Sequence, residues 1–189
     1  GYTSVDAQLA AIMHSSINVF KAFPSGRPDL PVSYFTQFLF SEAYLEKVNK
    51  HLAMNIYTAI PNPITGNGRI RLCKGVLASK NMSQKIKNLH IPTVVLQSTD
   101  NILVNASNVD PFLTGRAANH LWSHEIKMNN PPERSCLGGR GVQLLEETMG
   151  RPYGAFVAWV KGGHEIKQEN KRFILDVVDV MCKIVWGVE

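Results

Sequence analysis

Two short runs of apolar residues constrain the fold of this 189-residue chain more than any other feature. They are IPTVVLQ at 91–97 and AFVAWV at 155–160, and neither alternates polar with apolar residues. Such runs are typical of strands that are buried on both faces of a parallel sheet. The segments between them predict helices rather than tight turns, so we expect an α/β fold. Because two parallel strands do not make a stable sheet alone, further residues must lie beside them.

Helical periodicity predicts helices on either side of these strands. Thr3 and Asp6 would form a capping box at the start of a helix over 3–21. Ser41 would cap a second helix over 41–60, whose acidic residues come early and whose lysines come late. Other expected elements are a turn region over 23–31, a loop over 61–68, short helices over 71–79 and 83–89, and a long amphipathic helix from Lys167 onward.

The segment 105–153 has the least regular pattern, and we expect much of it to be an inserted loop. NNPPERSCLGGRG (129–141) is typical of a loop, and the following GVQLLEETM predicts a short helix. His120 and His124 are four residues apart, which would place both imidazoles on one face of a helix. Neither a metalloprotease glutamate nor a third ligand accompanies them, so we expect neither a metal nor a cofactor.

Length and composition fit one soluble domain. The chain has no run of 18 apolar residues, which predicts no membrane span. Its three cysteines are far apart and indicate neither a disulfide framework nor a zinc site, so we expect a reducing, cytoplasmic location. It begins with Gly1 rather than methionine, which we interpret as a processed or partial chain.

The positive charge of the chain is concentrated in one block. No acidic residue occurs between Glu46 and Asp100, whereas eight lysines and arginines lie in that stretch. We expect Arg69, Arg71 and Lys74 to be candidate contacts for an acidic protein partner, the alternative being a solvated basic face. Aromatic residues are not interleaved with these cations as a base-stacking surface requires, so nucleic acid is not expected as a partner.

Each apolar run continues into a distinctive loop. The first reads IPTVVLQSTDNILV (91–104), and the second reads FVAWVKGGHEIKQENKRFILDVV (156–178). These stretches resemble the C-terminal part of the α/β-hydrolase family, in which one late strand leads to a Gly-x-x-Asp-x-x-Val acid loop and the last strand to a Gly-rich turn with the catalytic histidine. The resemblance implies one partial domain over 1–189. Residues 1–90 would hold an early helix and a helical cap, 91–189 would hold the last core strands and the closing helix, and the sheet would be completed by residues outside this chain.

The same resemblance implies the site residues. His164 corresponds to the catalytic histidine, although an ordinary loop histidine is the alternative. Asp100 is the candidate acid, but aligning the loop without gaps places Asn101 at the acid position, and Asp6 is a more distant alternative. A serine nucleophile needs an imidazole to accept its proton and a carboxylate to hold that imidazole. An amide carries no charge and can hold the wrong tautomer, so it does not replace the carboxylate.

One part of the family pattern is absent. The chain contains no Gly-x-Ser-x-Gly elbow and no His-Gly oxyanion segment. We therefore favour a catalytically degenerate hydrolase-like domain that serves as a binding or structural subunit of a larger assembly. The alternative is the histidine-bearing half of an active serine hydrolase, whose nucleophile lies on a segment that is not in this chain. In both cases the missing N-terminal hydrolase half is the expected partner, on the same or a separate chain.

Overall fold

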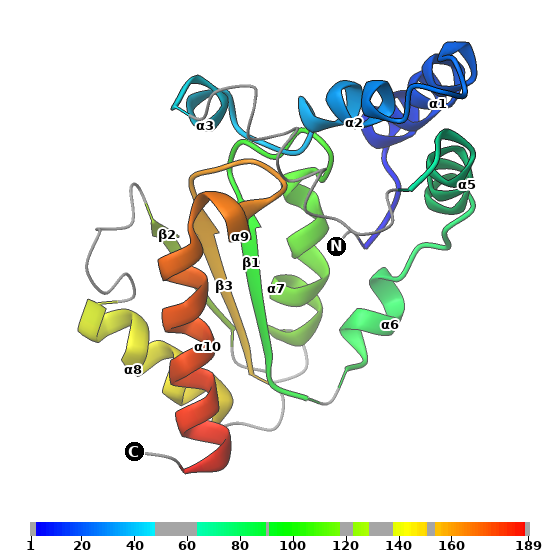
Figure 1. Cartoon of the computed structure of the whole chain (residues 1–189). Coiled ribbons are helices and arrows are strands. Elements are labelled where there is room, and N and C mark those ends of the chain that lie inside the picture. Colours follow the sequence, from blue (N-terminus) through cyan, green and yellow to red (C-terminus); the bar gives the residue numbers. More distant parts are fainter. Residues whose placement is uncertain are drawn as a thin grey trace.

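The computed structural model describes residues 3–47, 64–89, 91–117, 123–128, 138–150 and 154–187. Within them a three-stranded parallel sheet has the order β1-β3-β2 and is flanked by helices (Figure 1). The elements in chain order are α1 (Ala7–Ala22), α2 (Asp29–Thr36), α3 (Glu42–Lys47), α5 (Gly66–Leu77), α6 (Ser83–Lys87), β1 (Thr93–Ser98), η1 (Ala106–Val109), α7 (Asp110–Ala117), β2 (Ser123–Met128), α8 (Gly138–Met149), β3 (Ala155–Val160), α9 (Ile166–Glu169) and α10 (Lys171–Trp186).

The two predicted strands are confirmed and are direct neighbours. β1 and β3 pair in parallel with Thr93 opposite Ala155 and Ser98 opposite Val160. β3 is buried along almost its whole length because it is the middle strand, with β1 on one side and β2 on the other. The expectation of parallel strands joined by helical segments therefore holds.

The third strand, β2, was not predicted. His124 lies in β2 and not in the helix that would place the two histidines of this segment on one face. His120 lies outside the described residues. The sequence SHEIKM has few β-branched residues, so its strand conformation comes from pairing with the buried β3 rather than from its own propensity. The interval 105–153 thus contains η1, α7, β2 and α8 in place of one inserted loop.

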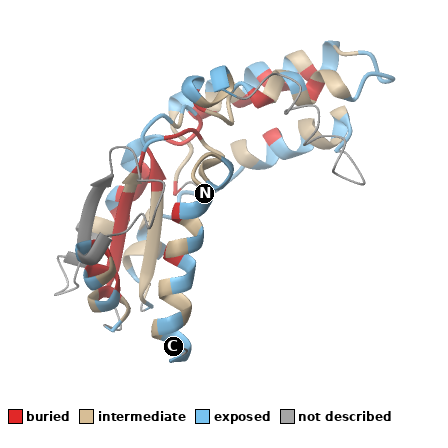
Figure 2. Ribbon diagram, turned by 60° about the vertical axis from the view of Figure 1, so that its left-hand side comes forward, coloured by how far each residue is buried: buried red, intermediate tan, exposed pale blue. Residues whose placement is uncertain are grey.

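Helices cover both faces of the sheet. Figure 1 shows α8 and α10 in front of the strands and α7 behind them. Alternate residues of β3, such as Phe156 and Val160, pack against Leu145 of α8 and against Phe173 and Val177 of α10. Figure 2 shows the same pattern, with the buried residues concentrated in the central strand and on the sides of the helices that face one another.

A second group of helices lies beyond the carboxyl ends of the strands, where α1, α2, α3 and α5 gather (Figure 1). α1 packs closely along α5, and their contact contains Leu9, Met13 and Phe20 from α1 and Cys73 from α5. Leu103, in the loop after β1, belongs to the same cluster. This second core therefore joins the upper helices to the loop that follows β1.

Local hydrogen bonds explain where the early helices begin. Asp6 alone caps α1, since its Oδ1 accepts from the Leu9 amide at 2.8 Å, whereas the Thr3 hydroxyl donates to Asn108 at 3.0 Å. The predicted capping box of Thr3 with Asp6 is therefore wrong. Ser41 accepts from the Tyr44 amide at 3.3 Å and caps α3 as expected. The rest of that predicted helix, over 48–60, lies outside the described residues.

The boundaries of three further helices differ from the predicted ones. α2 begins inside the segment 23–31 that was expected to be only a turn region. α5 begins at Gly66, because the Thr65 hydroxyl accepts from the Gly68 amide at 3.1 Å and caps the helix inside the predicted loop. α8 begins at Gly138, three residues before the predicted start. Among the described residues, no helix is long and apolar enough to cross a membrane.

Candidate functional site

Two consecutive glycines carry the chain from β3 to His164. Gly162 has φ of +150°, a backbone conformation that other residues rarely adopt. Gly163 has ordinary backbone angles but lies against the upper helices, where an added Cβ would be 2.5 Å from the backbone of Phe40 and Ser41. Both glycines are therefore required by geometry, and together they place His164 beyond the end of the central strand.

Asn101 is the residue of the β1 loop that meets His164. Its Nδ2 lies 3.3 Å from His164 Nδ1. Its Oδ1 accepts from the backbone amides of Leu103 and Val104, each at 3.0 Å. These two donors fix the orientation of the amide group, because they leave only its nitrogen to face the imidazole.

The two carboxylates considered as acids lie elsewhere. Asp100 is exposed and accepts from the hydroxyl of its neighbour Thr99 at 3.1 Å, while its backbone amide bonds Gly162. Asp6 is occupied as the cap of α1. The structure thus brings Asn101 and His164 together and leaves Asp100 and Asp6 away from the imidazole.

The direction of this hydrogen bond determines the tautomer of His164. Since Asn101 Nδ2 is a donor, Nδ1 of the ring must accept, and the neutral imidazole then carries its proton on Nε2. Burial lowers the pKa of His164 from its ordinary value of 6.5, which favours the neutral ring. In a serine triad the carboxylate accepts from Nδ1–H and leaves Nε2 free to take a proton. In this chain Nδ1 accepts a hydrogen bond instead of donating one, so Nε2 carries the proton and is a donor.

A half-buried carboxylate joins the loop that carries His164 to the upper helices. Glu169 of α9 accepts from the Ser41 amide at 2.7 Å, from the Ser41 hydroxyl at 2.6 Å and from the Gly163 amide at 3.0 Å. The Glu165 amide adds a bond of 2.7 Å to the Leu39 carbonyl. We call this set of contacts the Glu169 clamp; it holds the histidine loop against the segment that leads into α3.

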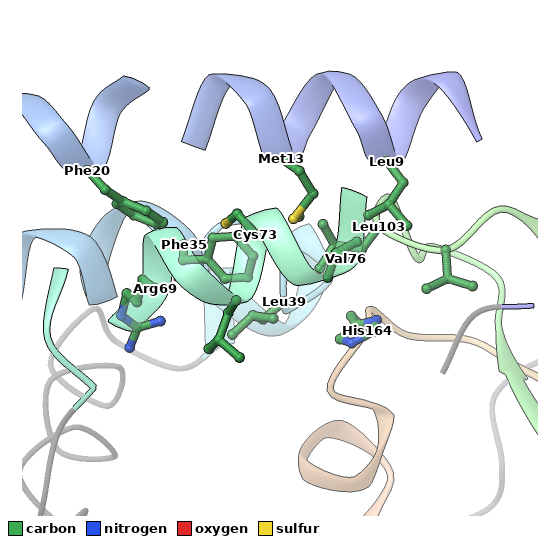
Figure 3. A pocket seen from close by; sticks show the side chains of 12 residues that line it. Leu9, Met13, Phe20, Phe35, Leu39, Arg69, Cys73, Val76, Leu103 and His164 are labelled. Atoms are coloured by element: carbon green, nitrogen blue, oxygen red, sulfur yellow. The ribbon is translucent and has the colours of Figure 1, made fainter. Parts of the chain in front are cut away.

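A cavity of about 300 Å³ lies between the upper helices and His164. Figure 3 shows α1 along one side, with Leu9 and Met13 directed into the cavity, and α5 beside it with Cys73 and Val76. His164 reaches the wall from the β3 loop (Figure 3). Burial raises the pKa of the Cys73 thiol, so this group stays protonated and acts as an apolar wall rather than as a nucleophile.

The three candidate cations of α5 do not form one patch. Arg71 and Lys74 are exposed and three residues apart on the same side of the helix. Arg69 is half-buried and lines the cavity instead. Within the described part of the chain no group of three or more potential metal ligands comes together.

Of the comparisons with known proteins, the one with solved structures found a similar chain. No family model matches the sequence, and no curated protein matches it. Among solved structures the chain is similar to MGS-M2, an alpha/beta hydrolase enzyme from a Medee basin deep-sea metagenome library, with a TM-score of 0.61 at 11% sequence identity. The chain has the α/β-hydrolase fold. At this identity the likeness concerns the fold alone, and the chain, matched over 100% of its length, spans 55% of that hydrolase.

Two features of the site had no signal in the sequence. The Glu169 clamp depends on Ser41, which is 128 positions away, and no periodic pattern links the two. The cavity likewise combines α1, α2, α5 and three loops, and most of its lining residues, taken alone, have the character of ordinary core residues. Neither feature is visible before the chain is folded.

Proposed function

We propose that this chain is a non-catalytic α/β-hydrolase-like domain that acts as a binding or structural subunit of a larger assembly. The observation that carries the proposal is the contact of 3.3 Å between the Asn101 amide nitrogen and His164 Nδ1. An imidazole held in this way has no lone pair on Nε2 with which to take a proton from a serine hydroxyl. In a serine protease the exchange of the triad aspartate for asparagine lowers turnover by about 10⁴ for the same reason.

The need for a larger assembly is supported by the free edge of β1. In the described sheet β1 has a strand partner on one side only. Its residues Val94, Val95 and Leu96 are only half-buried, although a run of apolar residues in a parallel strand is normally buried on both faces. A further parallel strand beside β1 would cover them. The solved hydrolase, of which this chain spans 55%, offers a source for it: the remaining part of the same fold.

The outer side of α10 supports the same conclusion. Leu175, Val178 and Val185 lie on one face of the helix and are 56%, 48% and 57% exposed. The charged residues Asp179 and Lys183 pair with each other on another side. A helix that is apolar on both its core side and a second side is normally covered on both. The occupant that we propose is a helix of the missing N-terminal hydrolase half, on the same or a separate chain.

A second contact is proposed for an acidic protein partner at α5. Exposed Arg71 and Lys74 would meet its carboxylates, with half-buried Arg69 at the margin. Association should then weaken as salt rises and when Arg71 and Lys74 are neutralised. Binding that does not depend on salt would contradict the proposed contact at α5. We further propose a reducing location such as the cytoplasm, on the wide spacing of the three cysteines in the sequence.

The test of the non-catalytic role is labelling with a fluorophosphonate, followed by intact-mass measurement of the native protein and of everything bound to it. The proposal expects no adduct on any component. The matched control is His164→Gln, which removes the imidazole. An adduct that forms on the native protein and is lost in this variant would establish the alternative, the histidine-bearing half of an active serine hydrolase.

A further inference from the structure

A second hollow lies where α3 meets the loops that follow β1 and β3. Its volume is about 430 Å³, and it shares no lining residue with the cavity beside His164. Both loops leave the carboxyl ends of neighbouring parallel strands, and α3 lies beyond these ends (Figure 1). In open α/β sheets, ligands bind in crevices outside the carboxyl ends of the strands. We call this hollow the α3 groove; its charged side chains are those of Lys47, Asp100, Lys161 and Glu169.

The floor of the α3 groove is ordered before any ligand arrives. The two oxygens of Glu169 accept three hydrogen bonds, from the amide and hydroxyl of Ser41 and from the Gly163 amide, so its charge is committed to the Glu169 clamp. The Asp100 amide donates to the Gly162 carbonyl at 3.0 Å, which fixes the β1 loop against the β3 loop. Because these contacts already order the loops, a ligand does not have to supply the free energy of ordering them.

The other three charged side chains of the groove are available. Within the described part of the chain, the Asp100 carboxylate has one side-chain contact, with the Thr99 hydroxyl at 3.1 Å, and this contact uses Oδ1 alone. Lys47 and Lys161 make no ion pair with any described residue. All three side chains belong to exposed residues that line the same hollow. The groove therefore offers a ligand one carboxylate and two ammonium groups.

We propose that the α3 groove binds an acidic α-amino acid, of the class of glutamate and aspartate. The ammonium group of the ligand lies against Asp100, and its two carboxylates lie against Lys47 and Lys161. One positive and two negative charges on the ligand match one negative and two positive charges in the groove, whereas a ligand without the ammonium group meets Asp100 with a like charge. The inference goes beyond the proposed function and does not depend on the state of His164.

The experiment titrates the full chain with L-glutamate at low salt, followed by calorimetry and by NMR chemical shifts. Two matched probes are glutarate, which has both carboxylates but no ammonium group, and 4-aminobutanoate, which lacks the α-carboxylate. We expect glutamate to bind more tightly than either probe, and its binding to weaken as salt rises. Asp100→Asn should weaken glutamate binding by about three- to tenfold without weakening glutarate binding, whereas Lys161→Gln should weaken both.

Lys167→Gln is the control for a lost surface cation, because Lys167 pairs with Glu165 at 3.2 Å and does not line the groove. It should leave glutamate binding unchanged. Ala43→Phe, at an exposed position of α3, fills the groove and should abolish binding, and thermal unfolding checks that each variant is folded.

Three results would overturn the inference: no binding of glutamate, binding that survives Ala43→Phe, and glutarate binding as tightly as glutamate. A loss of binding in Lys167→Gln as large as in Lys161→Gln would also overturn it, because it would mean attraction to the surface charge alone. Each of these results leaves the non-catalytic function standing, since fluorophosphonate labelling tests that function separately.

Discussion

Asn101 and His164 meet through an amide nitrogen and an imidazole nitrogen, and the backbone around Asn101 sets the direction of their bond. Two amide donors, from Leu103 and Val104, hold its oxygen. Turning the side chain over would give up both bonds, each worth about 1 kcal/mol, and would point its NH₂ group at two N–H groups. The orientation that makes His164 Nε2 a donor is thus built into the loop.

Asn101→Asp tests this arrangement directly. A carboxylate would keep the two backbone bonds and would place a negative charge against His164 Nδ1, so the pKa of His164 should rise and its proton should move to Nδ1. The matched control is Asp100→Asn, since Asp100 contacts Thr99 rather than the ring. Titration of the histidine signals by NMR measures both variants. A rise in the control variant of the kind expected for Asn101→Asp would contradict the geometry.

The half-buried position of His164 also predicts how stability depends on pH. Its folded pKa is lowered by burial below the ordinary 6.5. The unfolded chain then takes up a proton at a higher pH than the folded chain does, so the free energy of unfolding should decrease as pH falls from about 6.5 through the folded pKa. Denaturant unfolding across this range measures the effect.

His164→Gln should remove this pH-dependent loss, because glutamine can still accept from Asn101 but does not titrate. His14→Gln, on an exposed position of α1, should retain it. If both variants keep the same pH dependence as the unmodified chain, His164 is not the group responsible.

At the residue scale, the sequence located the imidazole but not its partner. The Gly-Gly-His turn after an apolar run predicted a loop directly after a strand, and His164 lies in such a loop after β3. Its role stays a prediction. The choice between Asp100 and Asn101 depended on how the β1 loop turns, and that turn is set by hydrogen bonds of Asn101 to Leu103 and Val104 that no residue pattern specifies. The gapless alignment of the loop placed Asn101 at the acid position, whereas the candidate carboxylate, Asp100, lies one residue earlier.

Among the elements, α9 is short, with four residues, Ile166–Glu169, but it carries the carboxylate of the Glu169 clamp. Through Glu169 it joins the histidine loop to the segment that leads into α3. Hydrogen bonds to a charged group are worth about 1.5–3 kcal/mol, more than bonds between neutral groups. The clamp thus links the sheet with the upper helices at one point.

Glu169→Gln should lower the free energy of unfolding by roughly 1.5–3 kcal/mol, because an amide offers no charge to Ser41 and Gly163 and presents them with an NH₂ group. Glu165→Gln is the control, since it loses only a surface pair with Lys167 at 3.2 Å, worth about 0–1 kcal/mol. Chemical denaturation of both variants measures the difference. Equal losses would mean that the Glu169 contacts contribute little to stability.

Elements were predictable where the pattern was strong and local. β1, β3 and the amphipathic α10 follow from their apolar patterns, α6 lies within the short helix expected over 83–89, and Ser41 caps α3 as predicted. β2 was missed because its stability comes from a neighbour that lies far along the chain. α5 was predicted to start too late because its first turn holds Gly66 and Gly68, which are weak helix formers that the Thr65 cap compensates.

At the scale of the whole molecule, the account depends on whether β1 gains a partner. The amides of Thr93 and Thr99 donate to the side of β3. By the alternation of a strand, the amides of Val94, Leu96 and Ser98 point to the other edge. In the isolated chain these three should exchange with solvent quickly, and those of Val95 and Gln97 slowly.

In the proposed assembly, all five amides should be protected, because a parallel strand from the proposed N-terminal half would bond the outer edge. Val95 and Gln97 serve as the internal control, since they face β3 in both states. Hydrogen exchange resolved by residue measures the effect. If the outer-edge amides exchange equally fast in the assembly and in the isolated chain, the proposal that a further strand extends the sheet at β1 is wrong.

The proton on Nε2 of His164 is the claim on which the proposed function rests, and ¹⁵N NMR of the imidazole tests it most directly. Two-bond proton–nitrogen correlations of the ring distinguish a protonated nitrogen from an unprotonated one. Above pH 7 we expect Nε2 to carry the proton and Nδ1 to be unprotonated in the chain with Asn101 intact. A proton on Nδ1, with a free lone pair on Nε2, would contradict the account.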